Sequence, residues 1–289
     1  MNGLKVTKLG NIGQHTHLKV YFNYFCHYLS AQSSMPRYFM VLAYNGTRFH
    51  GWQYQPNANT VQELLETQLS KLLEPGLKIT GAGRTDAGVH ASSFTAHFDS
   101  DKSDFIENAQ FIYTLNRMLP PDVVIHGIRR VQDNAHARFD ALSRTYQYHI
   151  LRKKDPFRTE TTWLYSAPLN PDIMQRGADR LLNYNDFRSF CKVHTDVRTF
   201  ICRIEEASWE FRPEEWIFTI KADRFLRNMV RAIVGTLWEM GRGKLSISDL
   251  DAILEAGNRS AAGLSVPASG LILTAIDYPS HLYPVSGRA

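Results

Sequence analysis

The chain has 289 residues, 44% of them hydrophobic and 21% charged, which is the composition of a globular protein and excludes a chain too polar to bury a core. This length fits one large domain or two joined halves. The net charge of +5 and the isoelectric point near 9.0 are compatible with an anionic partner, although an ordinary basic surface gives the same excess.

Residues 1–34 lack the sustained periodicity of the remaining chain and are expected to form a loosely ordered N-terminal extension. No apolar run in this segment approaches the ~20 residues that a membrane span requires, and no clean signal-peptide pattern is present. Met35 and Pro36, directly before the first predicted strand, mark the expected start of the folded part.

The first predicted half, residues 35–142, begins with an apolar strand at 38–44. Thr60 and Glu63 have the spacing of a capping box, which predicts a helix that continues to about Leu73. Periodicity predicts further strands at 77–80, 93–98 and 122–131 and a helix at 104–118.

The second predicted half, residues 143–289, opens on a strand in which Tyr146, Tyr148 and Ile150 alternate and therefore share one face. Helices beside mainly antiparallel strands indicate an α+β class. The remaining predicted elements are helices at 171–183, at 225–240 and from Ser248 with Asp251 as its capping partner, and strands at 203–211, 215–223 and 271–277.

The predicted helix at 225–240 has an unusual arrangement of charge around its first turn. Arg224, Arg227 and Arg231 are three and four residues apart, which places them on one helix face. The helix dipole disfavours cations at the N-terminal end, so an aspartate or an RNA phosphate is expected to compensate them. A solvated basic face is the ordinary alternative, above all for Arg224 and Arg227.

Three cysteines, Cys26, Cys191 and Cys202, form no Cys-x-x-Cys pair, which indicates reduced thiols in a cytoplasmic protein. Together with His194, the last two could be part of a metal site. No fourth ligand has a suitable spacing, so we predict no metal.

The run from Gly81 to Ala91, GAGRTDAGVHA, sets Asp86 among small residues in a loop between two predicted strands. Glycine allows the backbone to approach a ligand closely, and Arg84 offers planar donors suited to a phosphate or a base edge. A tight turn in which the aspartate caps its own backbone is the alternative for a shorter motif.

This run closely resembles the catalytic loop of the tRNA pseudouridine synthase A family. Four more places, which extend the resemblance over about residues 37–280, are similar to the family's motifs: the strand at 38–47 with the FHGWQ turn at 49–53, HARFDA at 136–141 with RTYQY at 144–148, FLRNMVR at 225–231 with Gly235, and the segment from Ala262 to Pro279. The resemblance implies two similar halves whose mainly antiparallel sheets join across a central basic cleft, with helices on the outer face.

The resemblance also implies a catalytic set. Asp86 is expected to be the nucleophile, Arg231 to form an ion pair with it, and Tyr146 to stack on the uracil or relay a proton. Relatives often have histidines after Phe-Leu, where this chain has Arg227 and Asn228, so the resemblance supports a role for these two residues less strongly. Further substrate-binding residues are expected at Arg84, Arg138, Arg144, Arg224 and Arg227, and residues that maintain the loop geometry at Gly83, Gly88 and His90.

The implied activity is isomerisation of uridine to pseudouridine at positions 38, 39 and 40 of the tRNA anticodon arm. Because nothing is oxidised and no group leaves, no cofactor or metal is expected, and the sequence contains no P-loop or Rossmann fingerprint. The implied partners are tRNA and a second copy of the chain, without DNA or a membrane. Whether Asp86 attacks C1′, attacks the uracil ring or acts through a glycal stays open.

Two other classes of function remain as alternatives. A non-catalytic RNA-binding or tRNA-folding protein would not need a carboxylate within an anion-binding groove. An enzyme acting on a nucleoside or a sugar phosphate would not need an extended basic surface.

Overall fold

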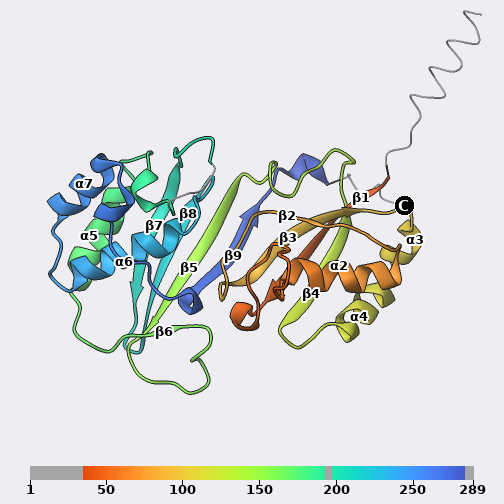
Figure 1. Cartoon of the computed structure of the whole chain (residues 1–289), viewed down its shortest axis with the longest axis horizontal. Helices are drawn as coiled ribbons and strands as arrows, with labels where there is room; N and C mark the ends of the chain where they lie inside the picture. The colour runs from red at the N-terminus through yellow and green to blue at the C-terminus, as the bar shows by residue number, and fades with distance from the viewer. Residues whose placement is uncertain (1–34, 193–196, 284–289) are drawn as a thin grey trace, which may run out of the picture. The chain divides into compact units, whose positions relative to one another are not determined.

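The computed structural model describes residues 35–192 and 197–283, so the predicted extension at 1–34 and His194 lie outside the described residues. One mixed sheet of nine strands runs through the described chain in the order β4-β1-β3-β9-β5-β8-β7, with β2 paired to β3 and β6 to β5 (Figure 1). The strands are β1 (Arg37–Tyr44), β2 (Thr80–Gly81), β3 (His90–Asp99), β4 (Val123–Arg130), β5 (Ser143–Leu151), β6 (Trp163–Leu164), β7 (Ile204–Phe211), β8 (Glu215–Ala222) and β9 (Leu271–Asp277).

Most neighbouring strands are antiparallel, and only the pairs β3–β9 and β5–β6 are parallel. The described residues also form six α-helices, namely α2 (Val61–Leu72), α3 (Ser103–Ile106), α4 (Ala109–Met118), α5 (Pro171–Leu181), α6 (Met229–Gly241) and α7 (Ile247–Ala256). The predicted α+β class with mainly antiparallel strands is confirmed. None of these helices has the length and apolar character needed to cross a bilayer.

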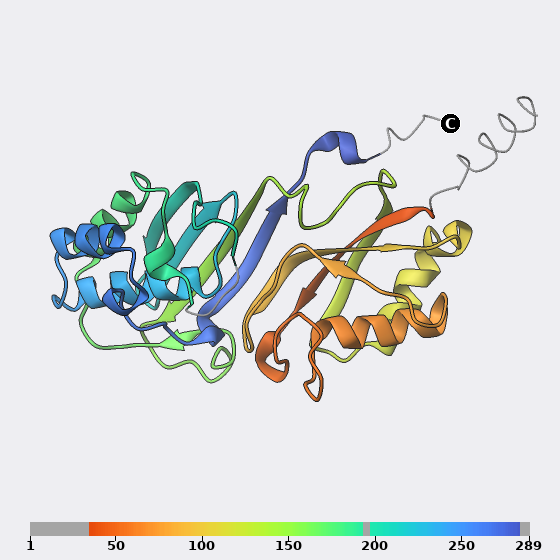
Figure 2. The same cartoon turned by 45° about the horizontal axis from the view of Figure 1, so that its top comes forward.

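The helices gather beside two parts of the sheet, α2 and α4 beside β1 to β4 and α5, α6 and α7 beside β5, β7 and β8 (Figures 1 and 2). Each part has its own core. One core contains Leu65 of α2 and Phe94 of β3, and the other contains Met174 of α5 and Ile233 of α6. Tyr146 of β5 packs against both cores, at the place where the two parts of the sheet meet.

The first helix begins where its capping residues predict. Thr60 Oγ1 accepts a hydrogen bond from the backbone N–H of Glu63 at 3.3 Å, and the helix then buries Val61, Leu65 and Leu69. The predicted helix at 104–118 is instead interrupted. Asn108 caps α4 through a hydrogen bond to the backbone N–H of Gln110 at 2.9 Å, which separates α4 from α3.

The predicted helix at 225–240 begins later, at Met229. Asn228 has φ 65° and ψ 5°, a left-handed conformation that cannot continue a right-handed helix backwards. Arg224 and Arg227 therefore lie in the segment before α6, and the prediction that they share a helix face with Arg231 is wrong.

The predicted start of α7, at Ser248, is also wrong. Ser246 is the N-cap and forms a capping box with Asp249, rather than Ser248 with Asp251. Asp251 instead accepts a hydrogen bond from Arg180 Nε of α5 at 2.7 Å. This ion pair joins two helices, which is a tertiary contact that a local capping pattern does not distinguish.

Candidate active site

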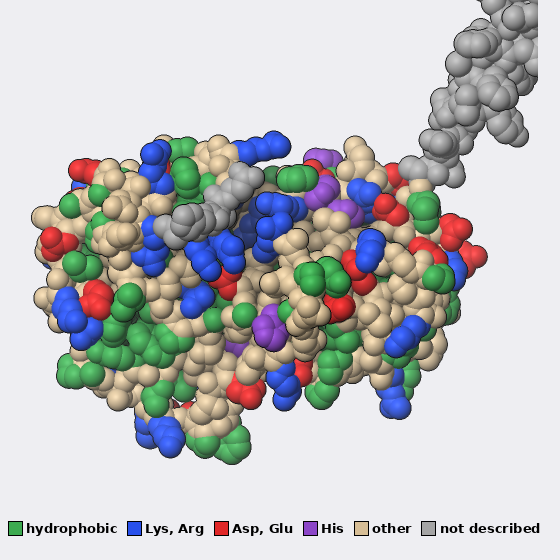
Figure 3. All heavy atoms as spheres, viewed as in Figure 1, with side chains coloured by type: hydrophobic (Ala, Val, Ile, Leu, Met, Phe, Trp, Pro, Cys, Tyr) green, Lys and Arg blue, Asp and Glu red, His purple; other side chains and the backbone are tan. Residues whose placement is uncertain are grey.

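A cleft of about 1700 Å³ is lined by the loop between β2 and β3, by β5, and by the segment that leads into α6. Small-molecule sites generally measure roughly 300–1,000 Å³, so this cleft can hold part of a larger ligand. Figure 3 shows Lys and Arg side chains gathered around a hollow on this face. Six of the predicted site residues that line the cleft are arginines: Arg84, Arg138, Arg144, Arg224, Arg227 and Arg231.

The loop that carries Asp86 is anchored through its neighbour Thr85, which is buried. Thr85 Oγ1 lies 2.9 Å from the hydroxyl of Tyr44, and the carbonyl of Thr85 accepts a hydrogen bond from the N–H of Trp52 at 3.3 Å. Gly51 has φ +89°, and a Cβ there would lie 2.3 Å from the Thr85 carbonyl oxygen. The FHGWQ turn therefore packs directly against the loop that carries Asp86, and this close contact requires glycine at position 51.

His90 ties the same loop to two other segments. Its Nδ1 accepts a hydrogen bond from the N–H of Gly46 at 3.0 Å, so Nε2 carries the proton and donates to the carbonyl of Ser269 at 3.1 Å. Burial lowers the pKa of His90, which favours this neutral form. Gly88 has φ +77°, whereas a side chain at Gly83 would meet no atom within 4 Å, so the fold itself does not require glycine there.

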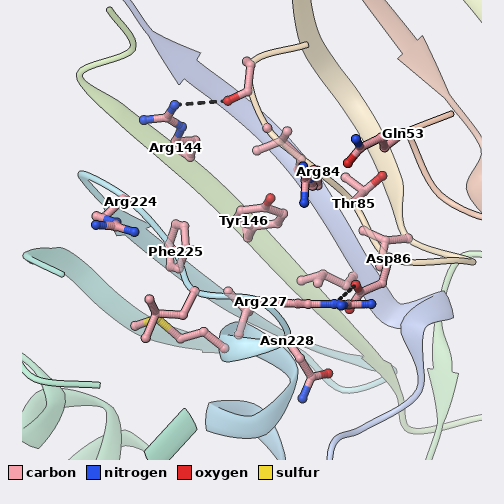
Figure 4. A pocket seen from close by; sticks show the side chains of 18 of the residues that line it. Gln53, Arg84, Thr85, Asp86, Arg144, Tyr146, Arg224, Phe225, Arg227 and Asn228 are labelled. Atoms are coloured by element: carbon pink, nitrogen blue, oxygen red, sulfur yellow. Dashed lines mark hydrogen bonds and ion pairs between the residues drawn. The ribbon is translucent and has the colours of Figure 1, made fainter. Parts of the chain in front are cut away.

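Asp86 faces two guanidinium groups. Arg231 Nη1 lies 3.5 Å from Asp86 Oδ2, and Arg227 Nε lies 3.9 Å from Oδ1, as Figure 4 shows for Arg227. The side chain of Arg231 is 20% exposed and that of Arg227 is 54% exposed, so Arg231 is the better shielded partner. Although Arg224 and Arg227 do not lie on the helix, the structure does bring Arg227 and Arg231 to the carboxylate.

Arg231 is held in place by a segment far away in the sequence. Its Nε donates to the carbonyl of Val266 at 2.8 Å, and the N–H of Val266 donates to the Arg231 carbonyl at 3.2 Å. Gly235, one turn further along α6, allows this contact, because a Cβ there would lie 1.7 Å from the carbonyl oxygen of Leu264. The segment at 264–266 thus fixes the guanidinium that faces Asp86.

Tyr146 presents its ring to the cleft from β5. The ring packs edge-on against Phe225, with centroids 5.1 Å apart and planes at 89° (Figure 4). A bulge in the pairing of β5 with β9 falls between Thr145 and Tyr146, and such bulges re-aim side chains. Tyr148, which was predicted to share this face, is fully buried in the core around α6 and donates from its hydroxyl to Pro267.

The environment of Tyr146 fixes its protonation state. Burial raises the pKa of Tyr146 to about 12, with Arg144 opposing the rise and Asp86 adding to it. At neutral pH the phenol keeps its proton and can donate it in a hydrogen bond.

Arg144 was predicted to bind substrate, but its guanidinium is occupied by the protein. Nη1 donates to the carbonyls of Ala141 and Asp223, and Nη2 donates to those of Ala82 and Arg138, at 2.6 to 3.1 Å. Burial lowers the pKa of Arg144. This arginine therefore joins three loops that line the cleft, a role that its sequence motif does not indicate.

Three other predicted binding residues have cationic groups that the protein leaves available. Within the described residues, the side chains of Arg84 and Arg224 make no hydrogen bond or ion pair, and Arg138 Cζ lies 5.6 Å from the ring centroid of Phe139. Asn228, which sequence reasoning set aside, donates to Ser265 Oγ at 2.6 Å and so helps to hold the segment beside Arg231.

The described residues contain no group of three or more His, Cys, Asp or Glu side chains placed to hold a metal ion. Cys191 and Cys202 are buried, and burial raises the pKa of Cys202 to about 12. These thiols belong to the core around α6.

His97 of β3 supports the cleft wall and provides a pH-dependent test of the fold. Its Nδ1 accepts a hydrogen bond from the N–H of Ala137 at 3.1 Å, and burial lowers its pKa to about 4. In the unfolded chain a histidine binds its proton near pH 6.5, so acid favours unfolding between the two pKa values. The stability from this group is complete above pH 6.5 and is lost progressively toward pH 4.

We therefore expect the free energy of unfolding to fall by about 2 kcal/mol between pH 7 and pH 5 because of His97 alone. Urea unfolding of the native protein and of His97→Asn at both pH values measures this contribution, since asparagine offers an acceptor that does not titrate. An equal pH dependence in the two proteins would show that His97 does not cause it.

Comparison with known proteins places these residues in context. A family model described as tRNA pseudouridine synthase matches residues 40–140 and 178–279. The chain is 48% identical to the tRNA pseudouridine synthase A of Bacteroides thetaiotaomicron over 252 residues, which are 86% of this chain and 93% of the relative. It is 49% identical to the proteins of the same name from Bacteroides fragilis and Porphyromonas gingivalis, over 86% of this chain and 99% and 100% of those relatives. The chain that brings Asp86 and Arg231 together in this cleft therefore belongs to the tRNA pseudouridine synthase A family.

Proposed function

We propose that this protein isomerises uridine to pseudouridine at positions 38, 39 and 40 in the anticodon stem-loop of tRNA. The observation that carries the proposal is the pairing of Asp86 with Arg231 and Arg227 in a large cleft, beside a tyrosine that stays protonated. Membership in the family supports tRNA as the substrate and isomerisation as the reaction.

The reaction breaks the N1–C1′ bond of a uridine and joins C1′ to C5, after which C5 loses its proton and N1 gains one. A carboxylate beside the sugar can form a transient covalent bond or stabilise positive charge at C1′. Asp86 is the side chain in the cleft that we assign to this step. Arg231 and Arg227 place positive charge 3.5 and 3.9 Å from its carboxylate oxygens.

The arginines that the protein leaves available suit the backbone and the bases of an RNA. Arg224 and Arg84 are free to contact phosphates, which provide most of the affinity for nucleic acids. A paired target uridine must leave its stack before it can reach Asp86, and Arg84, two residues away, is the side chain that we assign to the vacated space.

Tyr146 is assigned to the uracil, either as a stacking surface or as a proton donor. Replacement by phenylalanine keeps the ring and removes the hydroxyl, whereas alanine removes both. If stacking dominates, Tyr146→Phe should reduce the single-turnover rate by about tenfold or less, and Tyr146→Ala by at least another tenfold. Equal losses in the two variants would assign the effect to the hydroxyl, which the raised pKa keeps protonated.

The arrangement of the chain supports further parts of the proposal. We assign residues 35–142 and 143–289 to two similar halves of a pseudouridine synthase fold that meet across the cleft, with helices on the outer face. The two cores and the cleft between β3 and β5 support this division. A cytoplasmic homodimer that binds one tRNA across both subunits is proposed on family grounds.

The release of the C5 hydrogen tests the reaction directly. With tRNA labelled with tritium at C5 of its uridines, the protein should release tritium to water in proportion to the uridines at positions 38 to 40. A tRNA without uridine at these positions is the matched control and should release none. A protein that binds tRNA without any release would instead fit the non-catalytic RNA-binding alternative.

A further inference from the structure

An exposed aromatic ring lies on the wall of the cleft, apart from the catalytic set. Phe139 is 73% exposed and lines the same cleft as Asp86 and Tyr146. An exposed apolar ring stays in unfavourable contact with water, so a ligand bound in the cleft gains free energy by covering it. We propose that Phe139 is a stacking platform for an unpaired base of the bound tRNA other than the target uridine, an inference that rests on the proposed function.

The backbone on the N-terminal side of Phe139 is anchored by two contacts to Ala137. His97 Nδ1 accepts from the Ala137 N–H at 3.1 Å, and the hydroxyl of Tyr278 donates to the Ala137 carbonyl at 2.5 Å. Both partners lie in or next to the sheet, at β3 and just after β9. The loop that carries Phe139 is therefore attached to the rigid part of the fold.

The adjoining residues complete this attachment. Arg144 Nη2 donates to the carbonyl of Arg138 at 2.6 Å, and Asp140 closes the turn because its Oδ2 accepts from the N–H of His136 at 2.7 Å. Because the backbone is fixed on both sides of Phe139, binding of a base to its ring costs little conformational entropy of the loop. The exposure of Phe139 thus does not reflect a loose loop.

The surroundings of the ring favour a nucleobase over an apolar protein surface. The ring of His136 lies 4.3 Å away, and the guanidinium of Arg138 lies 5.6 Å from the centroid of Phe139. Arg84 and Arg224 add positive charge to the same cleft. Aromatic rings among cations are the usual combination for single-stranded nucleic acid, because bases stack on the rings while phosphates meet the charges.

The target uridine occupies a different place. Its sugar must lie beside Asp86 and its base near Tyr146, which is partly buried and packs against Phe225. Phe139 instead lies in the exposed loop that follows His136. The base that stacks on Phe139 therefore belongs to a neighbouring nucleotide, and the anticodon loop offers several that are unpaired.

Equilibrium binding of an anticodon stem-loop RNA tests the platform. Phe139→Ala and Phe139→Leu should each weaken the affinity about tenfold, whereas Phe139→Trp should bind at least as tightly as the native protein. Phe157→Ala is the matched control, because Phe157 is 95% exposed and does not line the cleft. It should leave the affinity unchanged.

The second arm identifies the base. RNAs with one abasic nucleotide at a time should reveal one unpaired position whose loss weakens binding to the native protein about tenfold and to Phe139→Ala very little. The proposal is overturned if Phe139→Leu restores the affinity, which indicates simple apolar packing, or if no position shows this coupling. Urea unfolding checks that the variants fold as the native protein does.

These measurements do not depend on turnover, so the two proposals can fail separately. Coupling between Phe139 and one base, without tritium release, would support the stacking platform and contradict the proposed isomerisation. Tritium release without this coupling would support the proposed isomerisation and contradict the stacking platform.

Discussion

Asp86→Asn is expected to reduce the single-turnover rate of pseudouridine formation by roughly 10⁴-fold or more while tRNA affinity changes little. Asparagine has nearly the shape of aspartate but neither its charge nor its nucleophilicity. The affinity persists because it rests mainly on phosphate contacts to basic side chains. Rapid mixing with excess enzyme gives the rate, and filter binding gives the dissociation constant.

The control for this variant is Asp172→Asn, a change to a carboxylate in the first turn of α5 that does not line the cleft. It removes the same charge and should keep the native rate. Product formation by Asp86→Asn at a rate near that of the native protein would remove Asp86 from its assigned role.

Arg231→Ala is expected to lower the single-turnover rate by about 10²- to 10³-fold. Asp86 would lose its better shielded partner and keep only Arg227, which lies 3.9 Å away and is more exposed. Arg231→Lys keeps a positive charge but loses the Nε hydrogen bond to Val266. Its rate should therefore lie between those of the native protein and Arg231→Ala.

Arg227→Ala is the comparison that separates charge from position. Arg227 is the more exposed and more distant partner. The fold reduction in the single-turnover rate should therefore be less than a tenth of that caused by Arg231→Ala. Equal rates for Arg227→Ala and Arg231→Ala would mean that Asp86 responds only to the total charge around it.

Elements with strong local signals could be predicted from the sequence. Thr60 caps α2 as its spacing to Glu63 indicates, and the closing strand runs from Leu271 to Asp277 as the apolar pattern predicts. These features depend on residues close in sequence, where hydrogen-bonding chemistry and alternation act directly. The Asp86 loop was also located between two strands, here β2 and β3.

The errors concern contacts between distant segments. The left-handed turn at Asn228 makes α6 begin at Met229, four residues later than predicted, and the segment before it folds toward Asp86. The surroundings of Arg144 were also not predicted, because nothing in its own motif shows that carbonyls from Ala82, Arg138 and Asp223 surround it. Only the tertiary fold brings these groups together.

The exposure of Phe139 illustrates the same limit. The HARFDA motif does not indicate whether Phe139 is buried or exposed, and the structure places it outside both large cores, next to the anchored residues Ala137 and Arg138. The surface of the cleft is therefore a property of the fold, whereas the residues proposed as catalytic could be named from the sequence motifs.

The most direct test of the proposed function is to incubate the protein with unmodified tRNA transcripts and to map pseudouridine at single-nucleotide resolution. We expect pseudouridine at positions 38, 39 and 40 wherever these are uridine, and at no other position. Pseudouridine confined to another arm of the tRNA, or none at any position despite tight binding, would contradict it.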